Sequence, residues 1–277
     1  MIEIQNITFG YRRKFKIFND LSLNLEAGKI YGLFGVNGAG KTTLLKQIGG
    51  LLRASSGKIE IGDKNIASRN ADVLSQIFLV PEEFALPSIK ASQFTALNKP
   101  FYRNFDNSLY QSIMNEFEIY DHENLSAMSY GQKKKFLISF AIATQTPIIL
   151  FDEPTNGLDI PSKSQFRRIM AQVITDDKCF VISTHQVRDL SSMIDHVMMI
   201  DKGKIVFNQS TYEISKKLLF KHTTDNVPDN VLYSEDTGTL KKIVSEAKGE
   251  ESEIDFETLF NAVIKNEQII NNAFKIN

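Results

Sequence analysis

The stretch from Gly35 to Thr43 has the residue types needed to bind a chain of phosphates. Its sequence follows the pattern of a glycine, four residues, a glycine, a lysine and a serine or threonine. Glycines let the backbone curl until several N–H groups point inward at one anion. We expect the backbone of this loop to surround phosphate at Asn37, Gly38, Ala39 and Gly40.

Three polar side chains at the end of this loop extend the same chemistry. Lys41 can reach the outer phosphates, the Thr42 hydroxyl can ligate Mg²⁺, and Thr43 can donate to an inner phosphate. A glycine-rich turn that merely enters a helix has the same pattern, so the flanking elements matter. A strand-like run at 29–34 precedes the loop and a helix-like run at 44–48 follows it, which favours phosphate binding.

A second group of candidate residues follows the apolar run 148–151, which is typical of a buried strand. Asp152 and Glu153 come directly after it, and buried strands rarely end in two carboxylates without a cation to neutralise them. Asp152 can hold Mg²⁺ through water, and Glu153 can orient or deprotonate a water that attacks a γ-phosphate. In isolation the pair is better interpreted as a solvated exit from a strand; the phosphate loop upstream reverses this preference and favours the catalytic interpretation.

The elements that must position these residues predict an α/β fold. Residues 2–30 alternate between apolar and polar positions, as in an antiparallel sheet. Residues 88–147 show helical spacing and indicate a helical insertion. From Pro147 onward strands and helices alternate, which predicts parallel strands with ligands at their carboxyl ends. Tyr11, near the end of the first alternating run, is either core or a ring that stacks on a base.

Composition restricts the class of protein further. The chain has 277 residues, 42% of them hydrophobic, and 32 Lys and Arg against 33 Asp and Glu, a net charge of −1. Without a basic excess we do not expect nucleic acid as the main partner. Cys179 is the single cysteine, which is compatible with a reducing cytoplasm. The sequence starts without a signal-peptide pattern and has no apolar run near the roughly 20 residues that span a bilayer, so another polypeptide would have to cross any membrane.

Short motifs along the chain resemble the ATP-binding cassette of ABC transporters, over about residues 2–210. The run Met128-Ser129-Tyr130-Gly131-Gln132 is similar to the family signature Leu-Ser-Gly-Gly-Gln. The run 152–159 is similar to the extended acidic motif and its D-loop, and His185 resembles the switch histidine. Alone, each has an ordinary explanation, such as a helix N-cap for Ser129 or a surface position for His185.

This resemblance implies a P-loop NTPase core with a mixed sheet and an N-terminal antiparallel β subdomain. The cassette would occupy residues 1–210, with a helical signature subdomain at about 83–147. Two cassettes would face each other head to tail, each ATP with its Mg²⁺ lying between the phosphate loop of one and the signature of the other. In this arrangement Glu153 would be the catalytic carboxylate, His185 would hold the attacking water, and Tyr11 would carry the adenine. Ser129, Gly131 and Gln132 would contact the partner's ATP, and Asp159 would lie at the dimer seam and link the two sites.

One departure from the family pattern affects the expected chemistry. In the run Val80-Pro81-Glu82-Glu83, Glu82 takes the position where the family usually carries a glutamine. A carboxylate can still accept from water or ligate Mg²⁺, but it adds a negative charge and cannot donate as an amide does. We therefore expect Glu82 in the catalytic and metal-binding set, with metal dependence or turnover shifted. The substitutions at Met128 and Tyr130 are expected to be tolerated.

The resemblance also implies partners and a location. A homodimer or heterodimer of cassettes would drive a separate transmembrane permease subunit from the cytoplasmic face of the membrane. Residues 211–277 carry no chemical motif and predict a small α+β accessory region, with a strand at 230–233 and helices at 240–247 and 254–264. The last of these is similar to the acidic-aromatic helix that follows cassettes of bacterial drug-efflux systems, and it favours an exporter.

Two other functions stay open at this point. A soluble ABC-type mechanical ATPase acting on nucleic acid or the ribosome shares the motifs, but a single cassette without a long coiled coil or a basic excess disfavours it. A GTP-dependent switch protein also begins with a phosphate loop. Its guanine motif, Asn-Lys-x-Asp, is approached only at 98–101, where the carboxylate is missing. The transported substrate is not encoded in motifs of this kind.

Overall fold

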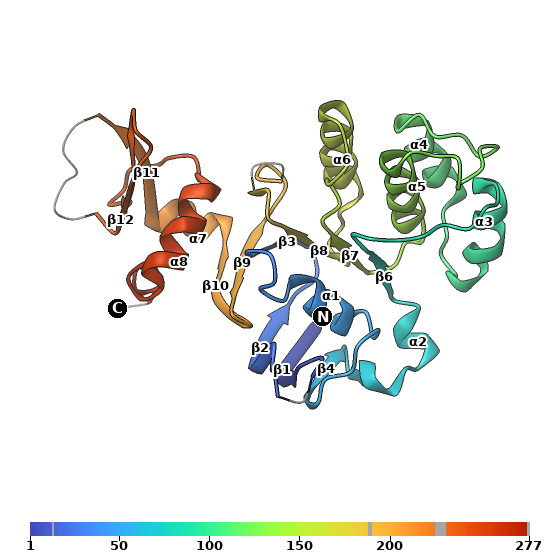
Figure 1. The fold of residues 1–277 in the computed structure, drawn as a ribbon, viewed down its shortest axis with the longest axis horizontal. Helices are drawn as coiled ribbons and strands as arrows, with labels where there is room; N and C mark the ends of the chain where they lie inside the picture. Colours follow the sequence, from blue (N-terminus) through green and yellow to red (C-terminus); the bar gives the residue numbers. More distant parts are fainter. Residues whose placement is uncertain (13, 188–189, 225–230, 276–277) are drawn as a thin grey trace.

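The central feature of the fold is a mixed sheet with the strand order β10-β9-β3-β8-β7-β6 (Figure 1). The computed structural model describes residues 1–12, 14–187, 190–224 and 231–275. Strands β9, β3, β8, β7 and β6 pair in parallel in this order, and β10 is antiparallel to β9. This confirms the predicted α/β fold with a mixed sheet. The strands are β3 (Lys29–Phe34), β6 (Ile77–Val80), β7 (Ile148–Asp152), β8 (Cys179–Thr184), β9 (His196–Asp201) and β10 (Lys204–Ser210).

Strand β7 shows how the apolar sequence specifies this sheet. Every residue of β7 is buried, because alternate side chains enter two different hydrophobic clusters. Ile149 and Phe151 belong to the cluster that contains helices α5 (Tyr130–Ala143) and α6 (Ile160–Val173). Ile148 and Leu150 belong to the cluster that contains α1 (Lys41–Ile48). A strand covered on both faces must be apolar throughout, so polar residues stand only at its carboxyl end.

The N-terminal sheet has the order β2-β1-β4-β5 and is antiparallel, as predicted. Its alternating apolar residues, such as Ile2, Ile4 and Leu23, join the cluster that covers α1. The sheet therefore supports the helix that begins directly after the glycine-rich loop. Its strands are β1 (Ile2–Phe9), β2 (Phe18–Leu25), β4 (Ser56–Ile61) and β5 (Lys64–Asn65).

A group of helices lies between β6 and β7 in the chain and at one end of the molecule in Figure 1. It contains α3 (Ala91–Asn98), α4 (Asn107–Glu116) and α5, while the short α2 (Ala71–Leu74) precedes β6. Short 3₁₀ turns are at Ile66–Ser68 and Lys99–Phe101. The insertion is helical as expected, and its proposed limits at 83 and 147 stay a prediction.

The C-terminal region forms its own small sheet, β11-β13-β12, followed by a long helix. The helix predicted at 240–247 is wrong, because this segment is strand β13 and pairs with β11 on one side and β12 on the other. Pairing on both sides outweighs the weak helical preference of the sequence. The elements are α7 (Thr211–Lys217), β11 (Leu218–Thr223), β12 (Tyr233–Asp236), β13 (Lys241–Glu246) and α8 (Phe256–Asn272).

Of the two other elements predicted in the C-terminal region, the helix is found and the strand mostly is not. The helix expected at 254–264 lies largely within α8. The strand expected at 230–233 is mostly not found: β12 begins at its last residue, Tyr233, and Asn230 falls outside the described residues. The limits of the cassette at 210 and of the accessory region at 211–277 stay predictions.

Helix α8 packs directly on the core of the central sheet. The ring of Phe256 meets Phe34 of β3 edge to face, with centroids 6.2 Å apart. Asn271 Nδ2 donates to Val206 O of β10 at 2.9 Å. One hydrophobic cluster therefore runs from the central sheet into the C-terminal region. Among the described residues, no helix has both the length and the apolar composition to cross a bilayer.

Candidate functional site

The glycine-rich loop connects the carboxyl end of β3 to the first turn of α1. Gly40 is the N-cap of α1 with a φ of 113°, and a Cβ at this position would lie 2.7 Å from the ring of Phe18. Backbone conformation and close packing thus both require glycine there. Lys41 is 6% exposed, and its Nζ donates to Gly35 O at 2.7 Å. The lysine therefore lies across the loop, with its charge at the centre.

The two carboxylates lie beside this loop at the carboxyl end of β7. Parallel pairing sets Asp152 opposite Ser183 of β8, and Ser183 Oγ donates to Asp152 Oδ1 at 2.6 Å. Glu153 Oε1 lies 2.8 Å from His185 Nδ1 and 3.7 Å from Lys41 Nζ. The Lys41 ammonium and the His185 imidazole thus both approach one buried carboxylate oxygen, Glu153 Oε1.

Glu153 has two further features of a functional residue. Its φ is +47°, a left-handed conformation that costs a non-glycine residue about 1–3 kcal/mol and persists only where the surroundings enforce it. Its other carboxylate oxygen, Oε2, is buried and has no hydrogen-bond partner among the described residues. A buried acceptor without a donor is suited to a ligand that brings a water or a cation.

A cavity of about 470 Å³ brings most of the predicted site residues together. Tyr11, Glu82, Glu153 and His185 come from four separate parts of the chain, and the glycine-rich loop forms the rest of the wall. The sequence reasoning did not single out Ile17 and Val36, which also line it. The loop residues at this cavity are Asn37, Gly38, Gly40, Lys41, Thr42 and Thr43.

Tyr11 and Glu82 line this cavity from outside the loop. Tyr11 is 61% exposed. Its ring packs edge-on against Phe9, and its hydroxyl lies 3.4 Å from Thr43 Oγ1. An exposed ring of this kind can take a planar base. Glu82 Oε1 accepts from Asn156 Nδ2 at 3.0 Å. Asn156, three residues before Asp159 in the sequence, therefore holds the Glu82 carboxylate at the cavity.

The side chains predicted to bind Mg²⁺ lie at the cavity or next to a residue that lines it. Within residues 1–12, 14–187, 190–224 and 231–275, no three His, Cys, Asp or Glu side chains cluster in a way that would hold a metal alone. Mg²⁺ usually takes one or two protein carboxylates and completes its shell with waters and substrate phosphates. The predicted donors are Asp152, Thr42 and Glu82; Thr42 and Glu82 line the cavity, and Asp152 directly precedes Glu153.

The signature-like residues lie away from the cavity of their own subunit. Ser129 is exposed and caps α5, with its Oγ accepting from Gln132 N at 3.2 Å and Gln132 Oε1 accepting from Ser129 N at 2.9 Å. A Cβ on Gly131 would come 2.8 Å from Gly157 O, so a larger residue would separate α5 from the loop after β7. Asp159 is exposed and caps α6, and hydrogen bonds from Ser162 lower its pKa.

The sequence reasoning missed three residues that the structure brings to this region. The sequence could have indicated Ser183, because its strand pairs in parallel with the strand that ends in Asp152. It could not have indicated the position of Asn156, since the contact of Asn156 with Glu82 joins segments 74 residues apart. Lys134 lies four and seven residues before buried Ile138 and Ala141, a helical spacing that places it on the apolar face of α5. Burial lowers the pKa of Lys134 to about 8, against the opposing effect of Glu82 and other nearby carboxylates.

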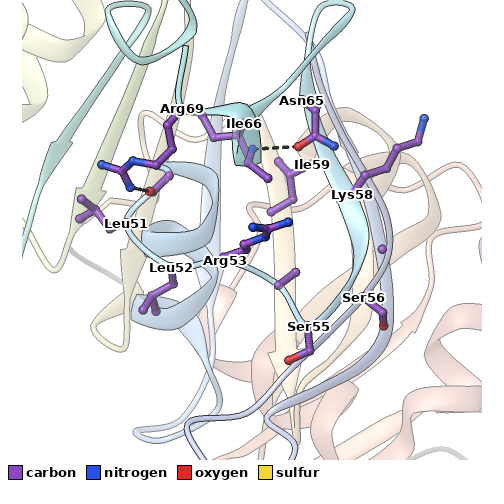
Figure 2. Close-up of a pocket in the computed structure, with 14 residues that line it drawn as sticks. Leu51, Leu52, Arg53, Ser55, Ser56, Lys58, Ile59, Asn65, Ile66 and Arg69 are labelled. Carbon is purple, nitrogen blue, oxygen red and sulfur yellow. Dashed lines mark hydrogen bonds between the residues drawn. The ribbon is translucent and has the colours of Figure 1, made fainter. Parts of the chain in front are cut away.

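A second cavity, of about 340 Å³, is drawn in Figure 2 and lies beside β4 and β5. Arg53, Lys58 and Arg69 lie around it, and Arg69 Nη1 donates to Gly50 O at 2.8 Å. Lys58 is paired with Glu60 at 2.8 Å. None of the residues predicted to bind nucleotide lines this hollow, so the two cavities are distinct.

Known proteins similar to this chain are ATP-binding proteins of ABC transporters. The sequence model of the family described as ABC transporter matches residues 18–156. The ABC transporter ATP-binding protein NatA of Bacillus subtilis is 31% identical over 211 residues, which cover 72% of this chain and 85% of that protein. An uncharacterized ABC transporter ATP-binding protein of Methanocaldococcus jannaschii is 26% identical over 271 residues, 94% of this chain and 97% of that protein. The chain spans only 39% and 38% of two longer Bacillus cereus relatives.

Solved structures share the fold. A dimeric structure of a post-hydrolysis state of an ATP-binding cassette bound to ADP and Pi aligns with a TM-score of 0.66 at 22% identity, covering 76% of this chain and 98% of that one. A bacterial Atm1-family ABC exporter with ATP bound aligns with a TM-score of 0.67 at 20% identity, covering 77% and 39%.

Relatives whose names state a direction of transport do not all agree with export. The zinc uptake system ATP-binding protein ZurA of Listeria innocua is 27% identical over 228 residues, covering 77% of this chain and 87% of that protein. The direction is therefore not common to the family. What the relatives share with this chain is the cassette: the chain belongs to the ABC transporter family and is one of its ATP-binding, ATP-hydrolysing proteins.

Proposed function

We propose that this chain is the nucleotide-binding subunit of an ABC transporter, which dimerises head to tail around ATP and drives a separate membrane permease. The observation that carries the proposal is the location of Ser129. It is exposed at the first turn of α5 and does not line the cavity of its own subunit. A hydroxyl and a helix N-terminus that face outward are suited to the phosphates of a neighbour's nucleotide.

Within one subunit, the loop from Asn37 to Thr43 surrounds the phosphates, and Lys41 neutralises the outer ones. On ATP binding the Lys41 ammonium exchanges Gly35 O for phosphate oxygen. Tyr11 stacks on the adenine. Magnesium, held by Thr42, Asp152 and Glu82 together with the phosphates, would supply charge neutralisation and polarise the γ-phosphate.

Hydrolysis is assigned to Glu153 and His185. Glu153 Oε1 already lies 2.8 Å from His185 Nδ1. The carboxylate and the imidazole can therefore bind the same water and hold it against the γ-phosphate. Glu153 accepts a proton from this water as it attacks. The partner subunit would contribute Ser129, Gly131 and Gln132 to the same phosphates, and Asp159 would lie at the seam between the subunits.

A permease partner would hold this chain at a membrane. The named relatives are ATP-binding proteins of transporters, and this chain has the cassette without a spanning helix among its described residues. We therefore place it at the cytoplasmic face of a membrane, bound to a transmembrane subunit. Export is our proposal for the direction, on the similarity of α8 to the helix that follows efflux cassettes.

The test uses Glu153→Gln, which keeps the shape of the side chain and removes the base. This variant should bind ATP without hydrolysing it and elute from gel filtration as a dimer in ATP and as a monomer in ADP. The matched control is the double variant Glu153→Gln, Ser129→Arg, which should bind ATP and stay monomeric. An ATP-saturated Glu153→Gln protein that remains monomeric would contradict the head-to-tail arrangement.

A further inference from the structure

Lys134 is a fully buried lysine in the helix that begins at the signature-like motif. Its exposed fraction is 0%, whereas its neighbours Lys133 and Lys135 are partly exposed. Removing an ammonium group from water costs several kcal/mol unless polar groups in the protein replace the hydration. The protein therefore has to surround this group with acceptors.

The acceptors come from the ends of two neighbouring strands. Lys134 Nζ donates to Pro81 O at 3.4 Å and Glu82 O at 3.2 Å, directly after β6. It also donates to Glu153 O at 3.3 Å, directly after β7. An ammonium has three N–H donors, and these three carbonyls can take all of them. One side chain of α5 thus holds the peptides of the two glutamates that line the nucleotide cavity.

Two aromatic rings cover the same ammonium. Nζ lies 5.4 Å from the ring centroid of Phe84 and 5.5 Å from that of Tyr130. The two rings stack on each other with centroids 5.4 Å apart and an angle of 21° between their planes. The Tyr130 hydroxyl donates to Glu82 O. Cation–π attraction holds the charge in place, and the rings separate it from water.

We propose that Lys134 is a positioning residue that fixes the Glu153 carboxylate for hydrolysis and connects α5 to it within one subunit. This inference rests on the proposed function, since it assigns a support to the same catalytic site. Glu153 has a strained φ of +47°, so both ends of its backbone need support. Its N–H donates to Ser183 O at 3.1 Å, and its carbonyl is held by Lys134.

This arrangement has a mechanical consequence. The Lys134 ammonium is five residues from Ser129, the residue proposed to contact the partner's ATP. A displacement of α5 relative to β7 would pull on the Glu153 peptide and move its carboxylate. Misplacing a catalytic group by about 1 Å can cost roughly a hundredfold in rate, so Lys134 couples docking of the signature turn to hydrolysis in the same subunit.

The test compares Lys134→Met with Lys133→Met, its partly exposed neighbour, in the full-length protein. Lys134→Met should lower kcat for ATP by about tenfold or more, while KM and the dissociation constant for a fluorescent ATP analogue change by less than about threefold. Lys134→Arg should recover part of the lost kcat, because a guanidinium can donate to the same carbonyls. Lys133→Met should leave kcat unchanged.

Two outcomes would overturn the proposal. The first is an unchanged kcat in folded Lys134→Met. The second is a parallel loss of kcat, ATP affinity and the unfolding midpoint that arginine does not rescue, because that pattern shows packing alone. If Lys134→Met does not fold, Lys134→Gln takes its place. Its amide is uncharged and can donate to only part of the carbonyl set, so kcat should still fall while ATP affinity is kept, and an unchanged kcat would overturn the proposal. Turnover by the unmodified protein and the ATP-trapped Glu153→Gln dimer test the proposed function separately.

Discussion

Gln47, in the helix that follows the phosphate loop, carries a buried amide whose replacement should stabilise the protein. Its exposed fraction is 0%, and neither Nε2 nor Oε1 has a hydrogen-bond partner among the described residues. The helix places it among apolar neighbours such as Leu44, Leu45 and Ile48, which are all buried. An unpaired buried amide costs roughly 1–3 kcal/mol in proteins. Gln47→Leu removes this cost with a small change in volume, so the free energy of unfolding should rise by about 1–3 kcal/mol.

Urea unfolding followed by circular dichroism measures this change. The midpoint should rise while the slope with urea stays the same, and Tm should increase by about 2–10 °C. Gln268→Leu is the matched control, because Gln268 is exposed on α8, and it should leave stability unchanged. ATPase activity should persist, since Gln47 does not line the nucleotide cavity. A Gln47→Leu protein no more stable than the unmodified chain would refute the reasoning about the unpaired amide.

Two further predictions concern the carboxylates of Glu82 and Asp255. Glu82→Gln should keep ATPase activity, because an amide oxygen can still accept from Asn156 Nδ2 while the negative charge near the phosphates is removed; a folded variant without any turnover would contradict this. Burial raises the pKa of Asp255, but hydrogen bonds from Thr258 and Lys242 have a larger opposite effect and bring the pKa down to about 2. The folded value lies below the ordinary one, so the stabilisation is present above about pH 4 and is lost as the pH falls toward 2. Asp255→Asn should therefore reduce the acid-induced loss of stability in that window, measured by thermal unfolding at pH 2 to 6, and an unchanged acid dependence would count against the assignment.

The sequence predicted the parts of the site whose chemistry is local. The glycine-rich loop and the Asp152-Glu153 pair each lie within a few residues, and the strands that carry them are apolar enough to identify. Tyr11, Glu82 and His185 line the same cavity as the loop, but they were assigned to the site only through the resemblance to the ATP-binding cassette, and their roles stay predictions. The sharpest local error, the helix at 240–247, arose because strand β13 is specified by its neighbours β11 and β12 and not by its own residues.

Contacts that join distant segments could not be predicted in this way. The bond between Asn156 and Glu82 depends on how the loop after β7 meets the loop after β6. Lys134 is one of three consecutive lysines, and only its spacing from Ile138 and Ala141 distinguishes it from solvated neighbours. The missing partners of Gln47 could not be anticipated either, because glutamine is ordinary in a helix and its isolation depends on tertiary packing.

The packing of α8 limits how the chain can be shortened. Phe256, Leu259 and Val263 are buried in the same cluster as Phe34 and Met199 of the central sheet. A recombinant fragment that stops at residue 210 would leave Phe34 and its neighbours uncovered, and an exposed apolar patch of this kind promotes aggregation. Expression trials and crystallisation screens should therefore retain the last helix, even when only the catalytic half is of interest.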